Sequence, residues 1–199
     1  MTDCRVPALL VVDVQNDFCP GGALAVSSGD TVVPALNRII EWTAKRGGAV
    51  YASRDWHAPK ASHFKDFGGV WPVHCVQETP GARFHPGLRL PADATVVTKG
   101  DRPDSDGYSA FEGHTPTGES FADDLKEKGI RHLHVGGLAT DYCVRHSVLD
   151  ALESGFDVTL LTDAVKGVDV NPGDSAKALE EMRRAGAKFA TTEEVVGRP

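Results

Sequence analysis

Short hydrophobic runs separated by amphipathic stretches recur along the whole chain. The runs are rich in Val, Leu and Thr, and several have no polar alternation, which is typical of strands buried on both faces of a sheet. They are residues 8–14, 48–53, 94–99, 132–138, 157–164 and 187–191. The pattern therefore predicts six strands.

Helical periodicity occupies four of the intervals between these runs. The first predicted helix is capped by Asp30 and continues through Thr43, and the others cover 119–128, 141–154 and 174–185. Each is followed by a glycine that can end a helix: Gly47, Gly129, Gly155 and Gly186. Strands that alternate with helices predict an α/β fold, with residues 1–199 as a single doubly wound domain. Its six-stranded sheet is expected to be mainly parallel and flanked by helices.

Two segments, 54–92 and 100–118, are rich in Pro, Gly, His and Trp and show no clear period. Loops of this length inside a compact domain are usually functional or disordered, and the many aromatic residues argue against disorder here. Ligands of open α/β sheets bind beyond the carboxyl ends of the strands. The residues predicted at such ends are Asp13, 54–57, Lys99 and 136–143.

Composition narrows the classes of partner. The formal net charge is -7, and no dense run of Lys or Arg is present, which argues against nucleic acid. No segment approaches the ~18–20 consecutive apolar residues of a membrane span, and no signal-peptide pattern precedes the first strand. We therefore expect no membrane association and a cytoplasmic location. The four cysteines are Cys4, Cys19, Cys75 and Cys143; they are widely spaced, and we expect free thiols.

Cys143 is the candidate nucleophile. It follows the segment GGLATDY at the start of a predicted helix. A helix N-terminus favours the thiolate, and backbone N–H groups of the preceding turn could hold an oxyanion. From position alone, a small buried hydrophobic residue explains this cysteine equally well. For the other three cysteines we favour that structural interpretation.

Asp13 and Lys99 lie at the ends of two hydrophobic runs. A carboxylate there is costly unless it is paired or takes part in chemistry. In a catalytic arrangement Asp13 would accept the thiol proton and return it to the leaving amine, while Lys99 would stabilise the thiolate. A structural ion pair is the alternative.

A group of metal-binding residue types follows the second predicted strand: Asp55, His57, His63 and His74. One carboxylate with several imidazoles suits Zn, Fe or Mn. Scattered loop histidines are the alternative, and we favour a structural interpretation for His132 and His134, which share a strand. His146 could pair with Cys143, but helical side chains lean toward the N-terminus, so it should reach back beside the first turn.

Five segments resemble the nicotinamidase (pyrazinamidase) branch of the isochorismatase-like cysteine hydrolases, in the order of that family and over nearly the whole chain. They are VVDVQNDFCPGGAL (11–24), SRDWHAPKASHF (53–64), WPVHCVQETPGARFHPGL (71–88), Lys99–Gly100 with YSAFEG (108–113), and GGLATDYCVRHSVLDA (136–151). The resemblance implies a catalytic triad and a set of metal ligands. The triad is Asp13, Lys99 and Cys143, and the ligands are Asp55, His57, His63 and His74.

The resemblance also implies substrate contacts. Phe18 and Trp71 would flank the substrate ring, and Tyr108 would lie near the pocket. Leu138 is a further expected substrate contact. Leu138 and Ala139 match a non-proline cis peptide, and the N–H groups of Ala139 and Cys143 would form the oxyanion hole. The roles of Tyr142 and Cys19 stay open.

The activity that the resemblance implies is metal-dependent hydrolysis of nicotinamide to nicotinate and ammonia through a cysteine thioester, in pyridine-nucleotide salvage. Pyrazinamide is an expected side substrate, one divalent ion (Zn, Fe or Mn) the expected cofactor, and a monomer or small homo-oligomer the expected state. Two alternatives remain. One is a metal-free hydrolase of carbamoyl amides or of a vinyl ether such as isochorismate. The other is a non-enzymatic binding module.

Overall fold

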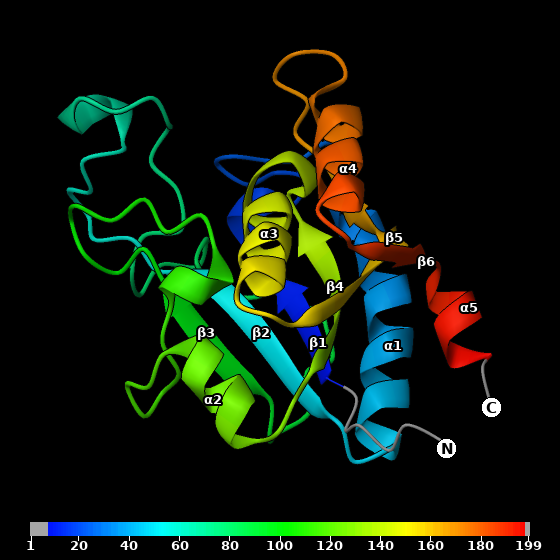
Figure 1. Cartoon of the computed structure of the whole chain (residues 1–199). Coiled ribbons are helices and arrows are strands. Elements are labelled where there is room, and N and C mark those ends of the chain that lie inside the picture. Colours follow the sequence, from blue (N-terminus) through cyan, green and yellow to red (C-terminus); the bar gives the residue numbers. More distant parts are fainter. Residues whose placement is uncertain (1–7, 198–199) are drawn as a thin grey trace.

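The computed structural model describes residues 8–197, and their centre is a six-stranded sheet of order β3-β2-β1-β4-β5-β6 (Figure 1). The prediction for Cys4 lies outside the described residues. All five pairings between neighbouring strands are parallel, so the predicted sheet is confirmed. The strands are β1 (Ala8–Val12), β2 (Ala49–Asp55), β3 (Thr95–Lys99), β4 (His132–Leu138), β5 (Asp157–Lys166) and β6 (Lys188–Ala190).

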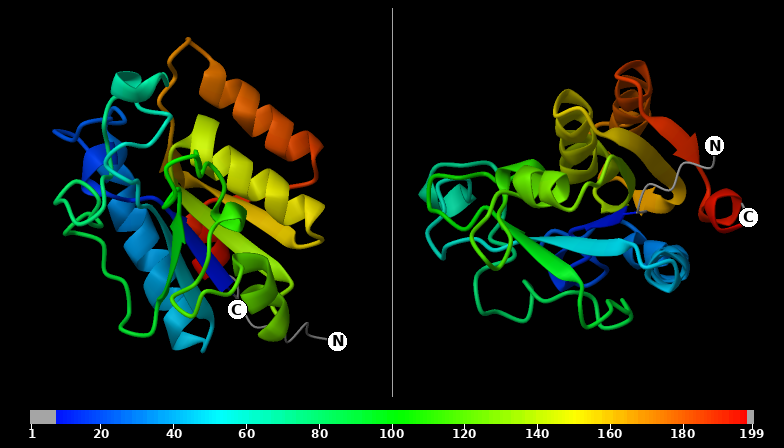
Figure 2. Two further views of the ribbon diagram at one scale, coloured as in Figure 1. Left: turned by 90° about the vertical axis from the view of Figure 1, so that its left-hand side faces the viewer. Right: turned by 60° about the horizontal axis from the view of Figure 1, so that its bottom comes forward.

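Helices cover both faces of the sheet, as expected for a doubly wound fold (Figure 2). They are α1 (Val33–Lys45), α2 (Phe121–Glu127), α3 (Arg145–Glu153), α4 (Asp174–Arg184) and α5 (Thr192–Val196). Leu10 and Val12 of β1 pack into one core with α2, α3 and α4. Leu9 and Val11 pack into the other core with α1 and α5. Alternate residues of β1 thus face opposite helical layers, which explains why its sequence is hydrophobic throughout.

The first and third predicted helices begin later in the structure than expected. Asp30 is not a cap: it lies in a short 3-10 helix, Gly29–Val32, and α1 begins at Val33 with Pro34 in its first turn. Proline suits that position because a first-turn N–H has no helical partner. Residues Thr140–Val144 form a π-helical turn, so α3 begins only at Arg145. Cys143 is therefore in the turn before the helix.

The helix α5 was not predicted, although its capping box is visible in the sequence. The Thr191 hydroxyl accepts from the N–H of Glu194, and the Glu194 carboxylate accepts from the N–H of Thr191. The glycine stops are confirmed, since Gly47, Gly129, Gly155 and Gly186 all have positive φ after a helix. Among residues 8–197, no helix combines the length and hydropathy that a membrane crossing requires.

A long excursion, residues 56–94, separates β2 from β3 and projects to one side of the sheet (Figure 1). In the described structure it contains the short 3-10 helix Lys65–Phe67 and is otherwise irregular. The strand register fixes the position where the excursion starts, because Asp55 at the end of β2 lies opposite Lys99 at the end of β3. The excursion therefore leaves the sheet at the carboxyl edge, where ligands bind in α/β folds, and rejoins it at the opposite edge, where β3 begins at Thr95.

Candidate active site

The three predicted triad residues meet at the carboxyl ends of β1, β3 and β4, with Lys99 at the centre. The Lys99 Nζ lies 2.8 Å from Asp13 Oδ2 and 3.5 Å from Cys143 Sγ. It also donates to the Gly107 carbonyl at 2.7 Å and forms an ion pair with Asp55. Asp13 and Lys99 are at most 1% exposed and Cys143 8%, so water screens these charges little.

Local backbone geometry turns Asp13 toward this centre. Its φ is 47°, its N–H donates to the Ser53 carbonyl at 3.2 Å, and the Ser53 hydroxyl donates to Asp13 Oδ1 at 2.7 Å. On the other side of β1, a Cβ at Gly137 would lie 2.1 Å from the Val12 carbonyl oxygen, and its φ is 128°. Glycine is needed there for β4 to approach β1 so closely.

The pKa values of Asp13 and Asp55, the two carboxylic acids that contact Lys99, shift in opposite directions. Burial raises the pKa of Asp13 against the opposing attraction of Lys99. Burial would also raise the pKa of Asp55, but Lys99 and His57 outweigh it and hold that pKa well below its usual range. The two carboxylates overcome the effect of burial on Lys99 and raise its pKa well above the ordinary value.

Burial likewise raises the pKa of the Cys143 thiol well above its ordinary value, even though Lys99 acts in the opposite direction. The expected thiolate at a helix N-terminus is therefore wrong for the free protein. The reason is that the sulfur lies in a dry site that also contains Asp13 and Asp55. A neutral thiol beside a carboxylate of raised pKa is suited to proton transfer at the moment of attack.

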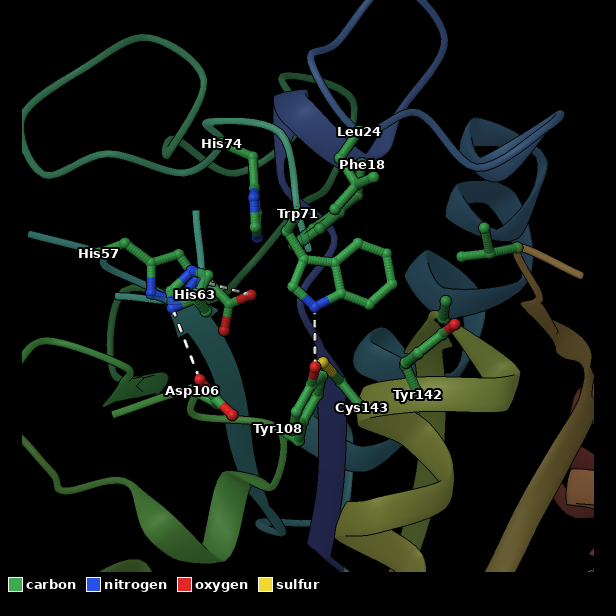
Figure 3. Close-up of a pocket in the computed structure, with 13 residues that line it drawn as sticks. Phe18, Leu24, His57, His63, Trp71, His74, Asp106, Tyr108, Tyr142 and Cys143 are labelled. Carbon is green, nitrogen blue, oxygen red and sulfur yellow. Dashed lines mark hydrogen bonds and ion pairs between the residues drawn. The ribbon is translucent and has the colours of Figure 1, made fainter. Parts of the chain in front are cut away.

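Next to the triad, His57, His63 and His74 bring one ring nitrogen each to within 4.8 Å of one another (Figure 3). His57 Nδ1 lies 3.0 Å from the Gly100 carbonyl and His74 Nδ1 lies 2.7 Å from the Pro72 carbonyl. These contacts leave Nε2 of both rings for a ligand. Asp55 joins the two groups, since its Oδ2 is 3.4 Å from His57 Nε2 while its Oδ1 contacts Lys99.

The chemistry of this cluster fits a divalent metal. Both ring nitrogens of His63 are buried without a hydrogen-bond partner, an arrangement that costs free energy unless another group binds there. Burial lowers the pKa of His63 to about 4 and also lowers the pKa of His74, so these imidazoles are neutral at pH 7. Neutral imidazole nitrogens with one ionised carboxylate are a donor set for Zn, Fe or Mn.

A pocket opens between the triad and the histidines (Figure 3). Trp71 forms one wall; its Nε1 donates to the Tyr108 hydroxyl at 2.8 Å, and its ring contacts Tyr142 edge to face at 5.0 Å between centroids. Phe18, predicted to flank the substrate ring, also lines the pocket. Tyr108, expected near the pocket, and Tyr142 line it as well. The other described residues that line it are Leu24, Asp55, His57, His63, His74, Asp106, Ala139, Cys143 and Val168.

The 138–139 junction has the expected cis peptide bond, and both Ala139 and Cys143 line the pocket. The Leu138 side chain was expected to touch substrate, but it is fully buried in the core on the α1 side of the sheet. Ala139 thus lines the pocket, whereas the Leu138 side chain lies in the core.

His146, the alternative partner of Cys143, lies elsewhere. Its ring stacks on Tyr108 at 5.2 Å between centroids, and its Nε2 is 3.3 Å from Arg145 Nη1. It is not among the described residues that line the pocket. This placement favours Asp13 over His146 as the base. Cys19 and Cys75 are buried free thiols, as predicted, and burial raises the pKa of Cys19 to about 11.

Several residues that line the pocket or support it were not predicted from the sequence. Leu24, Asp106 and Val168 line the pocket from loops whose paths no periodicity reveals. Tyr142, whose role the sequence left open, lines it from the turn that contains Cys143. Gln15 supports the metal cluster from outside. Its amide nitrogen donates to the carbonyls of Asp55 (2.8 Å) and Ala82 (2.9 Å), and its amide oxygen accepts from the N–H of Asp55 at 2.8 Å. The sequence signal for this role was the presence of a polar residue, Gln15, two positions after Asp13.

Asp141 was also missed, although it lies two residues before the nucleophile. Its carboxylate accepts from the backbone N–H groups of Val168 (2.9 Å) and Asp169 (2.7 Å). These bonds fix the loop after β5 so that Val168 forms a wall of the pocket. The contact spans 27 residues, so sequence spacing gives no sign of it.

Known proteins are similar to this chain over nearly its whole length. The isochorismatase domain family matches residues 7–194. The nicotinamidase of Escherichia coli is 46% identical over 200 residues, and the alignment covers 92% of this chain and 94% of that protein. The nicotinamidase/pyrazinamidase of Mycobacterium tuberculosis is 39% identical over 185 residues, and the alignment covers 92% of this chain and 97% of that protein. The crystal structure of the pyrazinamidase of Pyrococcus horikoshii in complex with zinc superposes with a TM-score of 0.86 at 46% identity, covering 94% of this chain and 99% of that one.

Proposed function

Because the chain belongs to the isochorismatase family, we propose that it is a metal-dependent nicotinamidase. It hydrolyses nicotinamide to nicotinate and ammonia through a thioester on Cys143, with pyrazinamide as a side substrate. The observation that carries the proposal is the position of Lys99, whose ammonium contacts Asp13, Asp55 and Cys143 beside a three-histidine cluster. The nicotinamidases and pyrazinamidase to which the chain is similar support the substrate.

Asp13 is the general base and Cys143 the nucleophile. As the sulfur attacks the carboxamide carbon, the thiol proton passes to Asp13, and a tetrahedral oxyanion forms. The raised pKa of Asp13 brings it closer to that of the thiol, which reduces the cost of this transfer. Lys99 offsets the negative charge that the sulfur and carboxylate share during the step.

Collapse of the tetrahedral adduct breaks the carbon–nitrogen bond. Asp13 returns the proton to the amide nitrogen, which leaves as ammonia, and a thioester remains on Cys143. Water activated by Asp13 then attacks the thioester and releases nicotinate with the thiol restored. The N–H groups of Ala139 and Cys143 hold the oxyanion in both halves, and each such donor contributes roughly 3–4 kcal/mol in comparable sites.

His57, His63, His74 and Asp55 would hold the metal, which we propose to be Zn, Fe or Mn. When bound, the ion supplies an anchor for the pyridine nitrogen of the substrate. Trp71 and Phe18 contact the ring, and the hydrogen bond from Trp71 to Tyr108 fixes the plane of the indole. The chain's own residues thus orient the carboxamide toward Cys143.

The charge of the pocket argues against the isochorismate alternative. Its acidic residues are Asp55 and Asp106, and no lysine or arginine is among the described residues that line it. A substrate with two carboxylates would lack a cationic partner, whereas a neutral amide needs none. The three-histidine cluster argues against a metal-free hydrolase, and the assembled triad argues against a non-enzymatic module.

The test is ammonia release from nicotinamide by the Cys143→Ala variant, with metal content measured on the same sample. We expect turnover to fall by at least about 10⁴-fold while the metal stays bound. Without the nucleophile, only substrate binding and stabilisation of the oxyanion still accelerate the reaction. The His57→Ala variant is the complement: metal and substrate binding should weaken together. Near-normal turnover by Cys143→Ala would show that the mechanism is wrong.

A further inference from the structure

The three imidazoles of the cluster are not equally supported. His57 and His74 each place Nδ1 against a backbone carbonyl, at 3.0 and 2.7 Å. His63 has no hydrogen bond to either ring nitrogen, and both nitrogens are buried. A histidine that binds a metal almost always donates its second N–H to an acceptor, which fixes the tautomer and the ring orientation. His63 therefore needs an acceptor that the other two rings already have.

The acceptor in position is Asp106. Its Oδ1 lies 3.8 Å from His63 Nδ1, and Figure 3 shows the carboxylate directed at that ring. The distance exceeds a direct hydrogen bond, but a bridging water or a small side-chain rotation closes such a gap. The Asp106 side chain is 55% exposed, so it is free to rotate, whereas the His63 side chain is 6% exposed and held in place.

The backbone holds Asp106 in this position from both sides. The Gly107 carbonyl accepts from Lys99 Nζ at 2.7 Å. A Cβ at Gly107 would lie 2.4 Å from the Gly100 nitrogen, and its φ of 65° also favours glycine. On the other side, the N–H of Ser62, next to His63, donates to the Pro103 carbonyl at 2.8 Å. The loop that carries Asp106 is thus attached to the triad and to the histidine segment.

We propose that Asp106 is the positioning residue of His63. Its carboxylate accepts Nδ1–H, directly or through one water, and so presents Nε2 to the metal; its negative charge also increases affinity for a cation. The inference rests on the metal-binding role proposed above and extends it by one residue. Asp106 contacts the ligand ring rather than the reacting atoms, so its effect should appear first in metal affinity.

The experiment measures the dissociation constant for Zn²⁺ by chelator competition, without substrate. We expect Asp106→Ala to weaken Zn²⁺ binding by about 10- to 100-fold, the usual effect of losing an outer partner of a ligand. Asp106→Asn keeps an acceptor but loses the charge and should lie between Asp106→Ala and wild type. Asp106→Glu keeps both and should restore affinity to within about threefold. The control is Asp104→Ala, which removes the same charge from an exposed position on the same loop.

Equal Zn²⁺ affinities for Asp106→Ala, Asp104→Ala and wild type would overturn the inference. A rise in KM for nicotinamide at unchanged Zn²⁺ affinity would also overturn it, because Asp106 would then act only as a wall of the pocket. Either result leaves the proposed function intact. Absence of Zn²⁺, Fe²⁺ and Mn²⁺ binding by the wild-type protein would instead count against the metal-dependent function, and with it this inference.

Discussion

The triad and the histidine cluster are neighbours, but different parts of the molecule hold them. Asp13 follows β1, Lys99 ends β3 and Cys143 lies in the turn after β4, so strand register and the two packed cores set their spacing. The histidines follow β2 in the 56–94 excursion, which is held by isolated bridges such as that of Phe64 with Trp71, where the Trp71 N–H donates to the His63 carbonyl at 3.0 Å.

The difference shows that one fold positions its functional side chains in two ways. A sheet edge positions a nucleophile and base without any ligand, because the register cannot change without disturbing the whole core. An irregular loop has few such constraints, so its ligand geometry depends on outer hydrogen bonds and on the ion itself. Asp55 belongs to both regions, since it ends β2 and contacts both Lys99 and His57.

Among the variants that compare the two regions, Asp13→Asn should have the largest effect. An amide cannot accept the thiol proton, so kcat should fall by about 10³-fold or more. The metal should stay bound, because Asp13 contacts Lys99 and Ser53 rather than the histidines. Ammonia release and elemental analysis of one preparation measure both. Loss of metal together with activity would show that the two regions do not act separately.

Lys99→Met should destabilise the fold by about 3–5 kcal/mol, since it leaves two buried carboxylates without their cation. Urea unfolding measures the change, and Lys45→Met, at an exposed pair with Glu41, is the control with no measurable effect. Lys99 normally lowers the pKa of Asp13. Without Lys99, the pKa of Asp13 in the folded variant lies above its value in the unfolded chain. Between these two pKa values the folded variant binds more protons than the unfolded chain, so the loss of stability should be smaller at pH 4 than at pH 7. A pH-independent defect would contradict this account.

Metal removal should loosen the excursion and leave the sheet unchanged. At a metal concentration 1,000 times the dissociation constant, bound metal stabilises a protein by about 4 kcal/mol, which the chelated protein loses. Hydrogen exchange should accelerate in residues 56–94, while amides of β1 and β4 keep their relative protection. Equal acceleration in both regions would mean that the ion supports the whole domain.

The smallest effect belongs to a position outside both regions. The Ser120 hydroxyl caps α2 by accepting from the N–H of Asp123 at 3.2 Å. Ser120→Ala should cost about 1 kcal/mol of unfolding free energy, with kcat/KM unchanged. A drop in kcat/KM beyond twofold would show that the sheet edge is less independent of its helices than the comparison implies.

The sequence by itself determined the strands, because short runs rich in Val and Leu, several without polar alternation, are typical of strands buried on both faces of a sheet. It also determined the edge where the chemistry lies, because parallel strands bring their carboxyl ends together, and so Asp13, Lys99 and the 136–143 turn could be placed in one site. The triad and ligand residues were expected in part from a family resemblance, and the structure brings them together.

Only the tertiary structure decided what depends on loop paths and on burial. Asp106 and Val168 reach the pocket from segments without periodicity, and Leu138 is buried away from it. The protonation of Cys143 also reversed: a helix N-terminus suggested a thiolate, but desolvation by the packed core raises its pKa. Local pattern determines which residues form strands and which end them. Long-range packing determines which side chains meet and how much water remains around their charges.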